Sequence, residues 1–266
     1  MAVGTDTSFS IIACAQENGI CGLKPPAGTL SPEGILPIAH TLDSAGAMAD
    51  TFSNALLLYS AMRDAPFAIP EAKSKLRIAV NTANEHVVSE GQREFLKNVL
   101  AELKQKGHAV EEILQPFSPY QRVVMQYEFQ PHLEEYLRAS DAPHKTLRDI
   151  VGVYRAHPET MMRYGIEYLQ RALEETPGGL NSACYREAMQ ERQKAIRQAR
   201  ALLNSYDAVI MTGPTNIMHF CGFPCVSIAA DQKNEQGVRR GLILYGIDEG
   251  RLYRAALALE KIIRTC

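Results

Sequence analysis

The stretch LRIAVNTANEHVVSEGQREFLKNVLAELKQKGHAVEEIL, residues 76–114, decides the class of fold. Residues 76–80 are a short apolar run, which is typical of a buried strand. Residues 87–106 carry apolar side chains at helical spacing, and Gly107 is a residue type that commonly ends a helix. Residues 108–114 then alternate as a second strand would. A strand, a helix and a strand of these lengths predict a βαβ unit, in which helices cover a largely parallel sheet.

The same patterns extend over the rest of the chain. The first forty residues are rich in Gly, Ser, Thr and Pro, which predicts loops that join short buried strands. Helices are expected at residues 44–63, 120–139, 159–174, 181–206 and 249–263, and strands at residues 208–211, 225–229 and 241–245. No internal repeat or linker divides the sequence, so we expect one domain over residues 1–266.

Composition excludes several classes of protein. Of the 266 residues, 46% are hydrophobic and 22% are charged, which is typical of a globular domain and not of a disordered or fibrous chain. The formal net charge of -2 gives no reason to expect a nucleic-acid partner. No apolar run approaches the roughly 20 residues of a membrane span, and no basic segment precedes the first apolar patch, so we expect a cytoplasmic protein. The six cysteines lack C-x-x-C pairing and are expected to be buried free thiols.

Common signatures of enzymes are absent from the sequence. There is no G-x-G-x-x-G, G-x-x-x-x-G-K-S/T, H-E-x-x-H or G-x-S-x-G, so a dinucleotide site, a P-loop, a zincin site and an ordinary α/β-hydrolase site lose their main support. His219, Cys221 and Cys225 form H-x-C-x-x-x-C, but no fourth ligand stands nearby. A metal-binding regulator is still one alternative interpretation of this motif.

The remaining candidate is the loop GTDTSFS at residues 4–10, which runs into the apolar residues Ile11 and Ile12. A loop of small residues can present a serine hydroxyl and aim consecutive backbone N–H groups at a developing oxyanion, which is what acyl transfer requires. Loops of this composition are also common as turns and helix caps.

This loop and the motifs that follow it resemble the amidase signature family. GTDTSFSI is similar to the family pattern G-T-D/E-T-(G/D)-G-S-I, and NGICGLKPPAG and LDSAGAMAD continue that signature region. Near the other end, YDAVIMTGPTN, CGFPCVSIAA and RRGLILYGIDEGRLYRAALALE resemble the family's later segments. The middle, VVMQYEFQPHLEEYL, is similar to a bacterial branch. The resemblance therefore covers essentially the whole chain.

The resemblance implies an α/β fold with a mixed central sheet flanked by helices, and hydrolysis of a carboxylic amide C–N bond without a metal or organic cofactor. Ser10 falls on the nucleophile, and the backbone N–H groups of Thr7, Ser8 and Phe9 fall on the oxyanion hole. Lys24 matches a lysine that is structural in the family. The implied ligand is a small-molecule amide.

Two departures from the family pattern bear on activity. The family's catalytic lysine and bridging cis-serine lie upstream of the nucleophile, and only residues 1–9 precede Ser10, so we expect a chain truncated at its N-terminal side and inactive or weakly active on its own. Phe9 replaces a glycine, and a positive φ at that position would strain it by about 1–3 kcal/mol. The alternative is a non-catalytic pseudoenzyme, or a subunit completed by a partner chain or by self-association that covers the exposed sheet.

Overall fold

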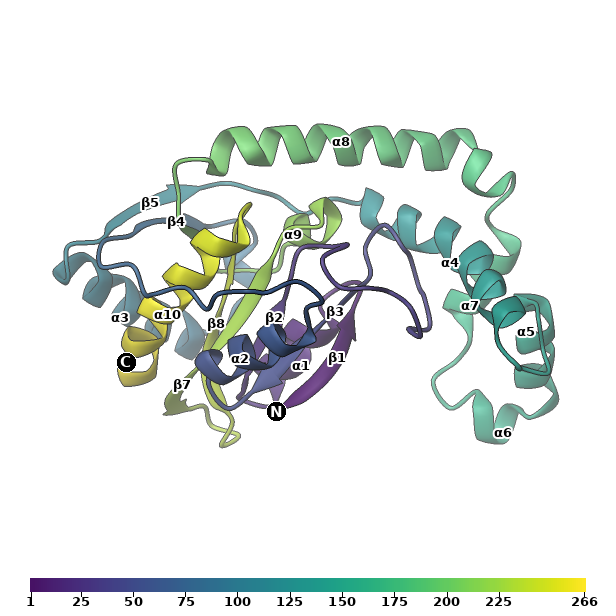
Figure 1. Cartoon of the computed structure of the whole chain (residues 1–266), viewed down its shortest axis with the longest axis horizontal. Helices are drawn as coiled ribbons and strands as arrows, with labels where there is room; N and C mark the ends of the chain where they lie inside the picture. Colours follow the sequence, from purple (N-terminus) through teal and green to yellow (C-terminus); the bar gives the residue numbers. More distant parts are fainter.

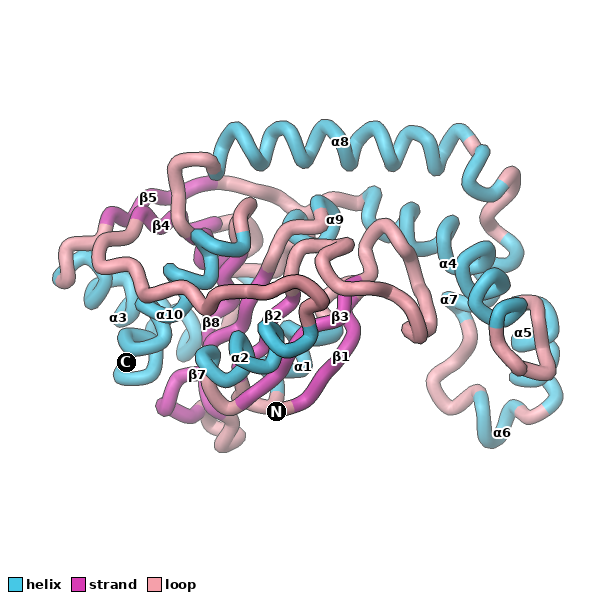
Figure 2. The backbone as a smooth tube through the Cα atoms, viewed as in Figure 1, coloured by secondary structure: helices cyan, strands magenta, loops and turns pink.

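The computed structural model describes residues 1–266, with the side chain of Glu85 left out of the description. Its centre is a mixed eight-stranded sheet in the order β1-β3-β2-β7-β8-β6-β4-β5 (Figures 1 and 2). The strands are β1 Ala2–Asp6, β2 Cys21–Lys24, β3 Ser44–Ala49, β4 Arg77–Asn81, β5 Ala109–Ile113, β6 Ala208–Met211, β7 Cys225–Lys233 and β8 Arg239–Tyr245. The mixed sheet that the resemblance implied is confirmed.

The predicted βαβ unit is present. Strand β4 pairs in parallel with both β5 and β6, and the helix α3 connects β4 to β5. Gly107 ends the connection with a φ of 77°, a conformation that glycine adopts without a steric cost. All other strand pairs are antiparallel, so the expectation of a largely parallel sheet was wrong. The short connections between neighbouring strands, such as that between β7 and β8, allow antiparallel pairing.

Helices cover both faces of the sheet. The helices are α1 Ser10–Glu17, α2 Phe52–Met62, α3 Glu90–Gln105, α4 Tyr120–Ala139, α5 Leu147–Ala156, α6 Pro158–Met161, α7 Glu167–Glu174, α8 Ala183–Leu203, α9 Ile217–Cys221 and α10 Glu249–Thr265. Apolar side chains from α2, α3 and α10 pack on one face, and those from α1, α8 and α9 pack on the other. Strand β8 shows why, because Leu242 and Leu244 enter the first core while Ile243 and Tyr245 enter the second. We call the sheet with these helices the sheet body.

A helical lobe stands beside the sheet body (Figure 1). It consists of α4, α5, α6 and α7, residues 120–174, and has its own small core around Leu133, Leu137, Leu147 and Val151. The long helix α8 runs from the sheet body across to the lobe and packs against α4. The lobe is therefore joined to the body through α8 and the start of α4.

Four predictions of secondary structure were wrong. The helix expected over residues 44–63 begins only at α2, because residues 44–49 form β3. Strand β3 packs closely on its neighbour: a Cβ on Gly46 would lie 2.2 Å from the carbonyl oxygen of Leu23, so this position requires glycine. The Thr51 side chain accepts a hydrogen bond from the N–H of Asn54 and starts α2.

The other three errors concern helices that the patterns missed or merged. The region expected to hold loops and strands contains α1, and the helix expected over residues 159–174 is divided into α6 and α7. Gly165 separates them with a φ of 76°. Helix α5 was not predicted, although the Thr146–Asp149 capping box that begins it is readable in sequence.

The cysteines are free, but not all are buried. Cys21, Cys221 and Cys225 are buried, whereas Cys14 and Cys184 are exposed and Cys266 is partly exposed, which corrects the expectation for those three. Among the described residues, no helix is both long enough and apolar enough to cross a membrane.

Candidate functional site

The serine loop, Thr7–Ser10, connects the end of β1 to the start of α1. Ser10 is the first residue of α1, and its side chain is exposed. No described acceptor takes a hydrogen bond from the backbone N–H groups of Thr7, Ser8, Phe9 or Ser10, whereas the next two N–H groups along the chain both donate to Asp6. Free N–H groups at a helix start attract negative charge. The loop therefore presents a hydroxyl beside donors suited to an oxyanion.

Phe9 adopts a left-handed backbone conformation, with a φ of 72° and a ψ of 7°. This is the positive φ that would strain a residue with a side chain, and the cost of such a conformation is on the order of 1 kcal/mol or more. Its ring packs on the imidazole of His219, with the ring centroids 4.1 Å apart. The contact shows what holds Phe9 in place, since burial of the ring against His219 offsets part of the backbone strain.

Asp6 fixes the start of α1 from inside the sheet body. Its Oδ2 accepts hydrogen bonds from the N–H groups of Ile11 at 2.8 Å and Ile12 at 3.4 Å. Its Oδ1 lies 3.1 Å from Nε2 of His219, although the two atoms are not aligned for a hydrogen bond. Burial raises the pKa of Asp6, but the His219 imidazole and the Lys24 ammonium lower it by more than burial raises it. The pKa of Asp6 therefore lies below the usual value. The carboxylate is therefore ionised and holds both helix N–H groups.

Lys24 is fully buried below this loop. Its Nζ donates hydrogen bonds of 3.0 Å to the carbonyl oxygens of Pro25 and Phe223. Burial lowers its pKa, while the charge of Asp6 acts in the opposite direction. Neither contact involves Ser10, and no described side chain makes a hydrogen bond to the Ser10 hydroxyl. The geometry agrees with a structural lysine that ties two loops together.

His219, Cys221 and Cys225 do not form a metal site among the described residues, in which no group of three candidate ligands is brought together. Burial raises the pKa of Cys221 to about 12 and that of Cys225 further, so both thiols are protonated. Burial also lowers the pKa of His219, which favours the neutral imidazole. These three residues pack in the core around the serine loop.

A large cavity adjoins the serine loop on the side of the helical lobe. Its volume is about 590 Å³, within the range of small-molecule sites. Ser8 lines it from the loop, Leu36 from the segment between β2 and β3, and Met125 and Phe129 from α4. We call it the lobe cavity.

Asp43 joins one wall of the lobe cavity to the serine loop. Its Oδ1 accepts a hydrogen bond from the Thr7 hydroxyl, and its Oδ2 accepts from the N–H groups of Ile38 at 2.9 Å and Ala39 at 3.0 Å. Gln121 of α4 adds a second link, since its Nε2 donates to the Thr7 carbonyl oxygen at 3.3 Å. The loop and the cavity wall are therefore held as one arrangement.

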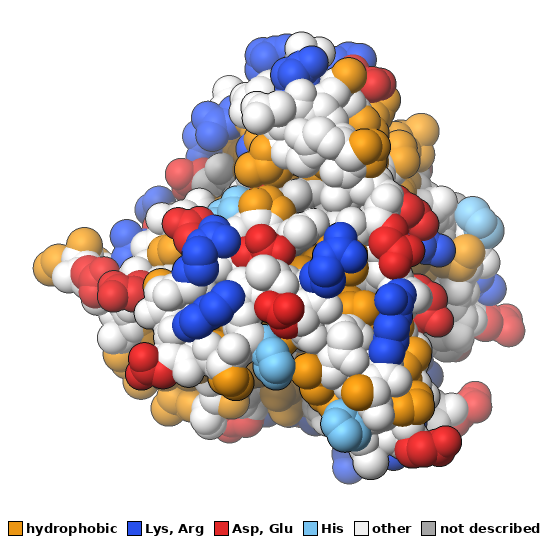
Figure 3. All heavy atoms as spheres, turned by 90° about the vertical axis from the view of Figure 1, so that its right-hand side faces the viewer, with side chains coloured by type: hydrophobic (Ala, Val, Ile, Leu, Met, Phe, Trp, Pro, Cys, Tyr) orange, Lys and Arg blue, Asp and Glu red, His pale blue; other side chains and the backbone are white. Residues whose placement is uncertain are grey.

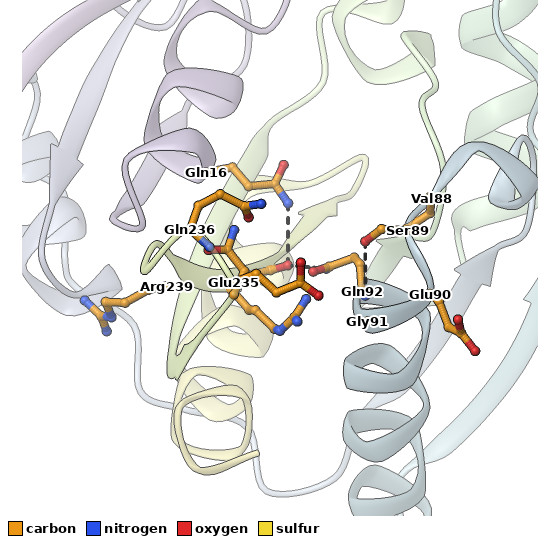
Figure 4. Close-up of a pocket in the computed structure, with 12 residues that line it drawn as sticks. Gln16, Val88, Ser89, Glu90, Gly91, Gln92, Glu235, Gln236 and Arg239 are labelled. Atoms are coloured by element: carbon orange, nitrogen blue, oxygen red, sulfur yellow. Dashed lines mark hydrogen bonds between the residues drawn. The ribbon is translucent and has the colours of Figure 1, made fainter.

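A second, polar pocket of about 440 Å³ lies between α1, the start of α3 and the β7–β8 turn (Figure 4). Gln16 and Gln92 reach into it from opposite sides, and both donate to the carbonyl oxygen of Gly241. Ser8 does not line this pocket, and Ser10 lines neither this pocket nor the lobe cavity. Its amides are already engaged by backbone, so it offers less for catalysis than the lobe cavity.

The structure brings the predicted residues Thr7, Ser8, Phe9 and Ser10 together as one loop. Sequence reasoning gave no role to Asp6 or Asp43, although both lie within the motifs that carry the resemblance. Asp6 was missed because a capping signal is read at the N-cap position itself, which here is Phe9. The walls contributed by α4 and α7 had no such signal, because they depend on how the lobe packs.

Comparisons with known proteins place the chain in a family. A family model described as amidase matches residues 1–220. A glutamyl-tRNA(Gln) amidotransferase subunit from Streptococcus pneumoniae serotype 19F is 27% identical over 320 residues, which cover 98% of this chain and 62% of that protein. The chain therefore belongs to the amidase family, and the resemblance found in its motifs is confirmed.

Solved structures show the same fold. The native peptide amidase of Stenotrophomonas maltophilia superimposes with a TM-score of 0.84 at 24% identity, over 99% of this chain and 62% of that one. An amidase family protein from Bacillus anthracis gives a TM-score of 0.84 at 21% identity, over 98% of this chain and 56% of that one. The chain thus spans about three fifths of the length of the relatives that it matches.

Proposed function

We propose that the serine loop takes part in hydrolysis of a carboxylic amide C–N bond. The observation that carries the proposal is the exposed Ser10 hydroxyl beside the free backbone N–H groups of residues 7–10. In the reaction, Oγ of Ser10 adds to the amide carbonyl and loses its proton to solvent water, and the N–H groups stabilise the oxyanion. The C–N bond then breaks, the leaving nitrogen takes up a proton, and water releases the acid from the acyl-serine.

The described residues supply the nucleophile and the donors, but no base for Ser10. General-base assistance contributes about 10² to 10⁴ in rate, so we expect weak amide turnover by this chain alone. The alternative function is a non-catalytic protein or a subunit that a partner chain completes. Two observations favour a partner: β1 lies at one edge of the sheet with Val3 exposed, and the amidotransferase relative is named as one subunit of a larger enzyme.

A serine-directed fluorophosphonate tests the nucleophile. Intact mass spectrometry of the labelled protein should show one adduct, which Ser10→Ala abolishes. Ser8→Ala is the matched control, because Ser8 is exposed in the same loop and should leave the adduct in place. Labelling that persists in Ser10→Ala contradicts the assignment of Ser10, and the absence of any adduct in folded protein favours the non-catalytic alternative.

Ammonia release from simple primary amides tests the rate. We expect slow release that depends on Ser10. Fast turnover that is lost in Ser10→Ala would show that some group of this chain activates the serine, contrary to the expectation of weak activity.

A further inference from the structure

The lobe cavity has an uneven distribution of charge. Among the described residues that line it, the only charged side chains are Arg122 of α4 and Arg171 of α7, and the rest are polar amides, Ser8 and apolar groups. Neither arginine has a described carboxylate within ion-pair distance, whereas six other arginines of the chain do, as Arg63 has with Glu249. The cavity wall therefore presents two uncompensated positive charges to a ligand.

The two arginines belong to one corner of the cavity. Arg122 lies one helical turn before Gln126 on α4, and both line the cavity with Phe129, one turn further on. The Gln126 side chain donates to the carbonyl oxygen of Arg171 at 3.3 Å, which ties α7 to α4 at this level. The two arginine side chains therefore extend from neighbouring backbone positions. These positions lie on two cavity walls that do not include the serine loop.

Most of the remaining lining of the cavity is apolar. Leu36 and Phe117 are 60% and 56% exposed, so their apolar side chains are open to a ligand in the cavity. Met125 and Phe129 line the α4 wall, and Ser8 forms the boundary with the serine loop. Figure 3 views the molecule from the side of the lobe, where charged side chains of both signs are scattered with hydrophobic groups between them. The positive charge in the cavity is thus local and not part of a basic face.

We infer that the lobe cavity binds the acyl part of an amide substrate that has an apolar or aromatic body and carries a carboxylate. The carboxylate is held by Arg122 and Arg171, whose planar donor groups match a carboxylate in geometry and charge. The body packs against Leu36, Phe117 and Phe129, and the amide group lies toward Ser8 and the serine loop. This inference rests on the proposed function, because it names the substrate class of that reaction.

Binding in the Ser10→Ala variant tests the inference without any turnover. The probes are 3-(4-carbamoylphenyl)propanoate and 3-(4-carbamoylphenyl)propan-1-ol, which share the amide and the ring and differ in the anionic group. Titration calorimetry at low salt should show the acid binding about tenfold tighter than the alcohol. This preference should shrink as salt is added, since both arginines are exposed.

Replacement of the arginines locates the carboxylate. The double variant Arg122→Gln, Arg171→Gln should reduce the preference for the acid to less than about twofold and leave the affinity for the alcohol unchanged. Arg148→Gln is the matched control, because Arg148 is an exposed arginine of the lobe that does not line the cavity. Phe117→Ser should weaken both ligands equally, and Leu36→Ser gives the same test on a different wall.

Three results would overturn the inference: equal binding of acid and alcohol, a preference that survives the double arginine variant, or no binding of either probe up to about 10 mM. These results are distinguishable from failure of the proposed function. Fluorophosphonate labelling reports on the Ser10 hydroxyl, whereas the titrations use a protein that lacks it.

Discussion

The sheet body and the helical lobe differ in the size of their hydrophobic cores. The body has two extensive cores, and residues such as Ile210, Leu244 and Leu259 are fully buried in it. The lobe has one small core drawn from its own helices, in which Leu133 and Leu137 keep 6% and 7% exposure. The serine loop is anchored in the body, whereas much of the cavity wall comes from the lobe. Substitutions in the lobe can therefore alter the lobe cavity without altering the serine loop.

The largest expected effect comes from the anchor of the serine loop. Asp6→Asn removes a buried charge that holds the start of α1 and faces His219 and Lys24, and loss of one member of such a group costs about 3–5 kcal/mol. Urea unfolding at pH 7 measures the loss in the free energy of unfolding. Asp64→Asn, at an exposed site, is the matched control and should cost almost nothing. A cost below about 0.5 kcal/mol for Asp6→Asn would show that the loop does not depend on the body core.

The same variant has a defined pH dependence. The pKa of Asp6 is lower in the folded protein than in the unfolded chain, so its contribution to stability is present above its ordinary pKa of about 3.9 and is lost as pH falls through the folded value. The difference in stability between the parent protein and Asp6→Asn should therefore shrink below about pH 4. A difference that stays constant down to pH 2 would contradict an ionised Asp6.

A pair of leucines tests whether body and lobe open independently. Leu244 in β8 and Leu147 in α5 are both fully buried, and leucine-to-alanine changes in cores cost about 2–5 kcal/mol. Hydrogen exchange should show that Leu244→Ala lowers protection throughout the sheet, whereas Leu147→Ala lowers it only in α4, α5 and α7. Equal loss of protection in β4, β6 and β8 with Leu147→Ala would mean that the two regions unfold as one unit.

Two variants at one position measure the strain in the serine loop. Glycine is usually less stable than alanine in a folded chain, but at a φ of 72° the order should reverse. Phe9→Gly should be about 1 kcal/mol more stable than Phe9→Ala, since both lose the contact with His219 and only glycine relieves the backbone. Thermal or urea unfolding of the two variants gives the difference. Equal stability would mean that the loop relaxes to another conformation when the ring is removed.

The smallest expected effect lies where body and lobe meet. Nδ1 of His132 in α4 accepts a hydrogen bond from the N–H of His40 at 3.2 Å, and the two imidazole rings are 4.0 Å apart. Burial and the neighbouring His40 lower the pKa of His132. Because the folded pKa is lowered, the stabilisation is present above about pH 6.5 and is lost as pH falls through the folded value.

Acidification from pH 7 to pH 5 should therefore weaken the contact between the body and α4 by less than about 1 kcal/mol. Hydrogen exchange in α4 at both pH values measures it, and His132→Gln should remove most of the difference. If the variant keeps the full pH dependence, another group is responsible.

Much of the body could be predicted from sequence because local pattern and tertiary environment agree there. Residues 76–114 alternate or repeat with the period of the element that they form, and Gly107 ends the helix where a positive φ is needed. Strand β3 was not predicted, because Gly46 is required by its close contact with Leu23 on the next strand, and no local pattern encodes that contact. Helix α1 was not predicted, because its start depends on hydrogen bonds to the buried carboxylate of Asp6.

The candidate site divides in the same way. The serine loop is contiguous in sequence, so its motif could be recognised and its residues named. The lobe cavity combines Ser8, Leu36 and Phe117 with side chains from two helices of the lobe, and these segments are separated by long stretches of chain. Their proximity follows only from the packing of α4 against α7 and α8.

The strand order has a consequence for synthesis of the chain on the ribosome. Strands β7 and β8 lie between β2 and β6, so the early strands β1, β2 and β3 have no connection to β4 and β5 until residues 225–245 have emerged. The α10 residue Glu260 also accepts the hydrogen bond from the Phe52 N–H at the start of α2. The early strands of the nascent chain therefore keep unpaired edges until residues 225–245 and α10 have emerged. The yield of the protein in cells should depend on how long these edges stay exposed.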